Sequence, residues 1–167
     1  MKVKEAVEKV EKDTEFKRWH KKNSKSYLAH VFKIVDEVNG NIWQVGYYNE
    51  DGTVTTFLLE GEDLKMLDAE EIFQKEKKKV HRLDLTKVKF DIDEALEIAK
   101  KFQEENVKGN DAAKIMLILQ NVAGHIIYNI TYITLAFNTL NMKIDAANKK
   151  VISHELTPML QFQGKAS

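Results

Sequence analysis

Five histidines are the side chains best suited to catalysis or metal binding in this sequence of 167 residues. They are His20, His30, His81, His125 and His154. Helical metal sites use spacings such as H-x-x-x-H or H-E-x-x-H, because these put two imidazoles on one side of a helix. No two histidines have such a spacing, and the chain has no cysteine. The sequence therefore predicts neither a metal site nor a thiol nucleophile.

Acidic groups at Glu50–Asp51, Asp91/Asp93/Glu94 and Glu104–Glu105 are the next candidates. General acid–base catalysis needs a carboxylate with a shifted pKa in a cleft. Each group instead has a local explanation, namely a turn, a helix cap and an exposed helix end. Glycine-rich nucleotide motifs and G-x-S-x-G are also absent. We therefore expect a protein that is not an enzyme, with no catalytic residues and no cofactor.

One group of residues could converge on a small-molecule pocket between a helix and a sheet. It consists of His125, Tyr128, Asn129 and Tyr132. Tyrosine, histidine and asparagine are typical orienting groups in such pockets.

A basic run offers a different binding hypothesis, in which Trp19 stacks on a base while Lys21 and Lys22 hold phosphates. Twenty-six basic residues balance twenty-six acidic ones, whereas nucleic-acid binding usually needs a basic excess. We therefore expect Trp19 to end the apolar face of a helix, and no nucleic-acid partner.

The chain is 43% apolar and 31% charged, as is usual for a folded soluble domain. Its N-terminal residues lack the apolar core of a signal peptide. The apolar stretch 112–137 contains Lys114 and several amides, which are costly at mid-bilayer depth. We expect a cytoplasmic protein without membrane contact. Zero net charge favours self-association, and the high Lys and Glu content is compatible with a thermophilic source.

The first half begins with an amphipathic helix over residues 2–22, kinked near Asp13–Thr14. Strands at 27–38, 41–49 and 53–59 follow as an antiparallel meander. Asn39–Gly40 and Asp51–Gly52 mark its hairpin turns, because these dipeptides tolerate positive φ. Residues 62–82 fit either a helix or two strands near 64–69 and 72–77.

The second half begins with a helix that Asp91 caps, with Glu94 reaching back to the cap. Gly109 ends that helix. Strands then follow at 113–122, 125–137, 142–146 and 150–155. Strand 125–137 is apolar on both sides, so it is predicted to be central in a sheet or covered by another surface.

The two halves share this order of elements. Val3, Ala6 and Val7 correspond to Ile92, Ala95 and Leu96; Trp43 to Tyr128; and Leu67–Asp68–Ala69 to Ile144–Asp145–Ala146. The repeat favours strands over a helix at 64–77.

Residues 91–156, and more weakly 2–77, resemble the PepSY domain family. The resemblance rests on Glu94–Ala99 in the helix and on Lys143–Ala146 followed by Lys150–Ile152, with Asn148–Lys149 where the family often has Thr-Gly. It implies an α+β fold of two cystatin-like halves, each a helix packed on a curved antiparallel sheet. We expect halves at 1–80 and 91–158, a linker at 81–90 and a tail at 159–167.

The resemblance implies an inhibitory or regulatory binding module without catalytic residues. The expected cytoplasmic location favours a general binding role over protease inhibition. We therefore predict a non-catalytic binding or regulatory module with a protein partner or self-association. The alternative is a small-molecule-binding or enzymatic α+β protein with a pocket between helix and sheet.

Overall fold

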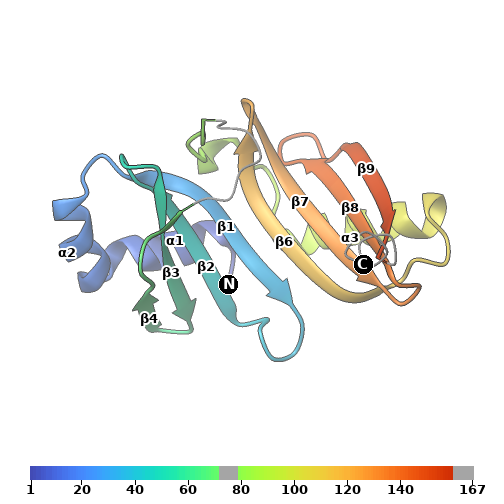
Figure 1. Cartoon of the computed structure of the whole chain (residues 1–167), viewed down its shortest axis with the longest axis horizontal. Helices are drawn as coiled ribbons and strands as arrows, with labels where there is room; N and C mark the ends of the chain where they lie inside the picture. Colours follow the sequence, from blue (N-terminus) through green and yellow to red (C-terminus); the bar gives the residue numbers. More distant parts are fainter. Residues whose placement is uncertain (72–78, 160–167) are drawn as a thin grey trace, which may run out of the picture.

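The computed structural model describes residues 1–71 and 79–159. Within these residues the fold is α+β, with three α-helices on one face of a nine-stranded antiparallel sheet (Figure 1). α1 contacts β2 and β3, α2 contacts β4, and α3 contacts β7 and β8. Over residues 1–71 and 79–159, the other face of the sheet carries no helix.

The first half contains two consecutive helices and a meander of strands. These elements are α1 (Val3–Lys12), α2 (Thr14–Lys22), β1 (Tyr27–Val35), β2 (Ile42–Tyr48), β3 (Thr53–Glu60), β4 (Asp63–Met66) and β5 (Glu70–Glu71). The predicted kink is confirmed, because α1 ends at Lys12 and the side chain of Asp13 caps α2 by accepting a hydrogen bond from the Glu15 amide.

The second half contains one helix and four strands. These elements are α3 (Ile92–Asn106), β6 (Ala112–Val122), β7 (His125–Thr134), β8 (Asn138–Asp145) and β9 (Val151–Pro158). A short 3-10 helix, η1 (Leu85–Lys87), lies between the halves. Helix followed by four antiparallel strands therefore occurs twice in the chain.

The strand order is β4-β3-β2-β1-β6-β7-β8-β9, with β5 also pairing with β3. β1 and β6 pair antiparallel at the centre, where Val31 lies opposite Leu119. This pairing joins both halves into one continuous sheet. β7 lies between β6 and β8, so its predicted central position is confirmed.

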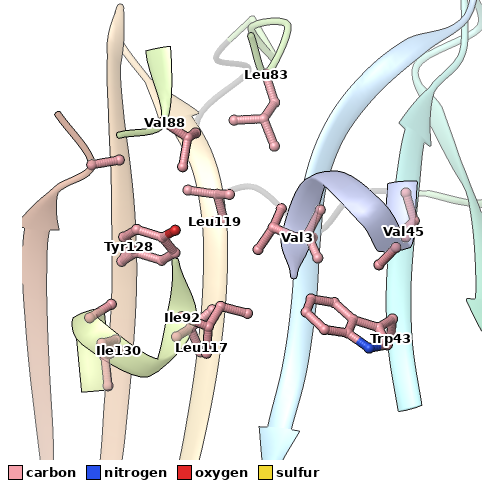
Figure 2. Packing of buried hydrophobic residues seen from close by; sticks show 14 of the residues in the cluster. Val3, Trp43, Val45, Leu83, Val88, Ile92, Leu117, Leu119, Tyr128 and Ile130 are labelled. Atoms are coloured by element: carbon pink, nitrogen blue, oxygen red, sulfur yellow. The ribbon is translucent and has the colours of Figure 1, made fainter. Parts of the chain in front are cut away.

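The core lies between the helices and the sheet. Val3, Ala6 and Val10 of α1 are fully buried, as their helical spacing predicts. In the second half, Ile92 of α3 packs with Leu117 and Tyr128 in the same cluster (Figure 2). Asp91 connects the two helix starts, because its carboxylate accepts hydrogen bonds from the backbone amides of Ile92 and Val3 at 2.8 and 3.2 Å.

The segment predicted to be a linker, 81–90, is part of the core. Leu83, Val88 and Phe90 are buried. The Leu83 amide donates a hydrogen bond to the carbonyl of Leu28 at 2.9 Å, and the Lys89 amide donates to Ala146 at 2.9 Å. The segment therefore contacts both halves, with Leu83 and Val88 near their junction (Figure 2).

The predicted two-residue turn at Asn39–Gly40 is wrong. The loop occupies residues 36–41, and neither Asn39 nor Gly40 has a positive φ. The Gly40 amide donates to the Asp36 carbonyl at 2.9 Å, and the Asp36 carboxylate accepts from the Asn39 amide at 2.5 Å. This local side-chain bonding builds a wider turn than the dipeptide alone would. At the second predicted turn, Gly52 does have a φ of 87°.

Several other boundaries also differ from the prediction. β7 ends at Thr134, and Phe137 is exposed with a φ of 59° in the next turn. Glu94 forms an ion pair with Lys149 instead of completing a capping box. Residues 62–82 were expected to form either a helix or two strands, and β4 confirms a strand at the start of this region. The predicted strand at 72–77 lies outside the described residues.

One part of the predicted repeat is also misaligned. Ile144 belongs to β8, the third strand of its half, whereas Leu67–Ala69 follow β4, the fourth strand. The two segments share only the dipeptide Asp-Ala after an apolar residue, and they occupy positions that are not equivalent in the fold.

Candidate functional site

The four residues predicted to line a small-molecule pocket do not converge. Tyr128 and Tyr132 point into the core under α3, with 0% and 3% exposure. The Tyr128 hydroxyl donates a hydrogen bond to the carbonyl of Phe90 at 2.6 Å. Asn129 lies on the opposite face of β7, where it accepts from the Asn141 amide group at 2.5 Å, and His125 is exposed at the strand start. The alternation of side chains along a strand separates them.

The residues considered for nucleic-acid binding, Trp19, Lys21 and Lys22, lie in different surroundings. Trp19 packs against the core, with ring centroids 5.2 Å from Phe57 and 5.7 Å from Tyr47. Its ring is half-buried and packs in part on these protein side chains. Lys22 is exposed, while Lys21 lines the cleft described next.

A cleft of about 1020 Å³ opens between the α1–α2 pair, the start of β1 and the 82–86 segment. It lies beside the junction of the two halves, which is a common place for ligand sites. Its floor is apolar and aromatic. The floor residues are Val7, Phe16, Leu28, Tyr47, Leu83 and Leu85.

The floor is rigid because its aromatic rings pack on each other. Phe16 lies 5.0 Å from Tyr47 and 5.3 Å from Phe57, measured between ring centroids. His20 stacks on Phe16 with an interplanar angle of 17°. α2 thus supplies one wall of the cleft with a ring surface that is already ordered, which reduces the entropy cost of binding.

Charged side chains form the rim. The basic ones are Lys4, Lys17, Lys21 and Arg82, and the acidic ones are Glu8, Glu11 and Asp84. The guanidinium of Arg82 lies 5.1 Å from the ring centre of Tyr27, which follows the turn after α2. Arg82 is therefore held at the end of the cleft where α2 ends and β1 begins.

Tyr47 is the buried polar group of the floor. Its hydroxyl donates a hydrogen bond to the Glu11 carboxylate at 3.1 Å. Burial, with a smaller contribution from the Glu11 charge, raises the pKa of Tyr47 far above its usual range. Tyr47 is therefore neutral at physiological pH and can orient Glu11 but cannot serve as a base.

The sequence alone did not reveal this cleft, because its lining comes from three separate segments. One of these segments, 82–86, was predicted to be a linker. The available signal was the pairing of Phe16 and His20 four residues apart beside a basic run, which puts rings and charges on one side of a helix.

Two further observations concern the whole described chain. Over residues 1–71 and 79–159, no group of three or more histidine, aspartate or glutamate side chains is arranged to hold a metal ion. Among the helices described, none is long and apolar enough to cross a membrane.

Comparison with known proteins gives one structural likeness. No protein-family model and no curated protein matches the sequence. Among solved structures, a candidate lipoprotein from Clostridium difficile 630 is similar, with a TM-score of 0.56 and 16% identity. The alignment covers 85% of this chain and 90% of that chain. At this identity the likeness concerns the fold alone, so this chain shares its architecture with that protein.

Proposed function

We propose that this protein is a non-catalytic binding module of two PepSY-like halves, and that its ligand site is the cleft between α1, α2 and the 82–86 segment. The observation that carries the proposal is the cleft itself, with its apolar aromatic floor and charged rim. A cavity of this size and lining is typical of sites for small organic ligands, which occupy about 300–1,000 Å³.

The PepSY-like description draws support from the repeated order of helix and four antiparallel strands. The direct pairing of β1 with β6 makes the two halves one rigid support for the cleft. The compartment stays a prediction: the sequence favours the cytoplasm, whereas the structural neighbour is a candidate lipoprotein. The proposed site does not depend on which of these applies.

A binding role suits the cleft better than catalysis does. Tyr47 keeps its proton, and His20 is stacked on Phe16. Asp84 accepts hydrogen bonds from the Thr86 amide and hydroxyl at 3.0 and 2.6 Å. The hydrogen bonds of Tyr47 and Asp84 and the stacking of His20 hold the walls of the cleft together.

Titration with the neutral apolar dye N-phenyl-1-naphthylamine tests this proposal through its fluorescence gain on binding. We expect binding by the native chain and strongly weakened binding by Thr86→Phe, which puts a ring into the cleft from an exposed position. Lys87→Phe is the matched control, because Lys87 is exposed on the same short helix but does not line the cleft. Equal effects of both variants would contradict the assignment.

A second candidate function is binding of an extended protein segment along β9. This strand has eight residues, pairs with β8 on one side, and forms one end of the sheet in the described chain. Ile152 and Leu156 are exposed at 52% and 41%. Exposed edge strands can pair with an added strand through their main-chain groups.

This second function is tested by sedimentation of the protein alone and with extended peptides of alternating apolar residues. Leu156 lies opposite Leu140 in a pair that is not hydrogen-bonded, so its amide faces the free edge; replacing Leu156 by proline would remove that donor and is expected to abolish strand addition. Leu156→Ala is the control, because it keeps the backbone amide. Complexes that tolerate Leu156→Pro would contradict binding along this edge.

A further inference from the structure

We infer that the ligand of the cleft is an amphipathic anion, with an apolar body on the aromatic floor and a negatively charged head group between Lys17, Lys21 and Arg82. The inference rests on the proposed function and specifies the ligand class of the same site. Three features of the cleft support it: the fixed positions of its acidic side chains, the absence of ion pairs at Lys17, Lys21 and Arg82 within the described residues, and its shape.

The acidic groups of the rim already have partners. Glu8 is 3.5 Å from Lys12, one turn along α1. Glu11 accepts the hydrogen bond of Tyr47, and Asp84 accepts two from Thr86. These interactions fix the positions of the carboxylates, and Glu8 is the one whose partner among the described residues is a cation.

The basic groups of the rim are available by comparison. Lys17 and Lys21 are four residues apart on α2, so they project from the same side of the helix. The rim carries four basic and three acidic side chains, and Lys17, Lys21 and Arg82 form no ion pair within the described residues. This group of cations is the part of the cleft that complements a single anion.

The position of these cations defines a polar end of the cleft. Arg82 lies over the ring of Tyr27, and Lys21 is in the last turn of α2, shortly before Tyr27 in the chain. Ser24 lines the same end and can donate a hydrogen bond. The apolar floor residues, Val7 and Leu85 among them, line the same cleft. A ligand with one charged end and one apolar body matches this layout.

The cleft volume favours a free molecule over a membrane surface. The cleft is open to solvent, and its volume of about 1020 Å³ is large enough to hold a small amphiphile. The floor residues Val7, Leu28 and Leu83 are at most 9% exposed, so a flat lipid surface would contact the rim but not the floor. We therefore assign the site to a single soluble molecule with a carboxylate, sulfonate or phosphate group.

The test compares two dyes that share a skeleton. 1-Anilinonaphthalene-8-sulfonate carries the anion, and N-phenyl-1-naphthylamine lacks it. We expect the sulfonate to bind more tightly, with an advantage that shrinks as salt is added. Lys21→Gln should weaken sulfonate binding about two- to fivefold, as for loss of one exposed ion pair, and leave the neutral dye unaffected. Lys22→Gln is the control, because Lys22 is exposed beside Lys21 but does not line the cleft.

The outcomes separate this inference from the proposed function. If the neutral dye binds and Thr86→Phe blocks it, but the sulfonate has no advantage or Lys21→Gln has no effect, the anion assignment is wrong and the cleft remains a ligand site. If neither dye responds to Thr86→Phe, the proposed function itself fails. Binding to phosphatidylglycerol vesicles that Thr86→Phe leaves intact, without sulfonate binding, would overturn both in favour of a membrane surface.

Discussion

Gly46 of β2 offers a sharp test of the packing on the helix-free face. It pairs with His30 of β1, and the imidazole lies directly over its backbone. A Cβ added at position 46 would lie closer than 3.0 Å to three atoms of that ring. His30 is half-buried and borders a hollow beside Val54 and Val80, so its ring can relieve only part of this overlap by moving. Gly46→Ala should therefore force the ring or the two strands to shift.

The expected size follows from two opposing effects. Overpacking in a filled site costs about 1–3 kcal/mol. Gly46 does not have a positive φ, so alanine at this position would recover about 0.4–1 kcal/mol of chain entropy. The net loss in the free energy of unfolding should be about 1–2 kcal/mol. For a chain of this length, that corresponds to a fall in Tm of roughly 2–8 °C.

The assay is urea unfolding of the native chain, both single variants and the double variant His30→Ala/Gly46→Ala. With the imidazole removed, Gly46→Ala should become neutral or stabilising, which gives a coupling energy of at least about 1 kcal/mol. A stabilising Gly46→Ala in the native background, or a coupling energy near zero, would refute the reasoning.

Three further predictions concern groups with defined partners. Burial lowers the pKa of His30, so the unfolded chain binds a proton at this histidine more readily than the folded chain does. The stabilising contribution of neutral His30 should therefore be complete above about pH 6.5 and decrease below it. Urea unfolding at about pH 7.5 and about pH 5.5 should show that the free energy of unfolding falls less with pH in His30→Gln than in the native chain. Asp91→Ala removes the acceptor for the Ile92 and Val3 amides and should cost about 1–2 kcal/mol in the free energy of unfolding, whereas Asp93→Ala, at an exposed position two residues on, should cost less. Tyr128→Phe loses a buried hydrogen bond and should cost about 1–2 kcal/mol while dye binding is unchanged; altered dye affinity would return Tyr128 to the ligand site.

The helices could be predicted from the sequence, because burial follows their spacing directly. Val3, Ala6, Val7 and Val10 repeat at the helical period and are all buried. The break at Asp13 was also predictable, since an aspartate before a new helical run is a strong cap. Strand 125–134 was recognisable as central because both of its faces are largely apolar.

The turns and the site depend on interactions that no local pattern reveals. The Asn39–Gly40 dipeptide predicts a tight turn, but the Asp36 carboxylate accepts a hydrogen bond from the Asn39 amide, and this bond stabilises a wider loop instead. Lys33 reads as a surface residue, yet it is buried over the ring of Trp43, at 4.0 Å from its centre. The cleft needs the 82–86 segment to pack against α1 and α2, and this long-range contact leaves no periodic signal in the sequence.

The shared carboxylate of Asp91 has a consequence for how the chain opens. It is the first anchor of both long helices, one from each half, and the central β1–β6 ladder joins the same two halves. If either half unfolds alone, the amide of Val3 loses its acceptor on Asp91, or the strand of the other half at the β1–β6 junction loses its neighbour. In native-state hydrogen exchange, the slowest amides of β1 and β6 should therefore open in one cooperative event, so that the duplicated architecture behaves as a single folding unit.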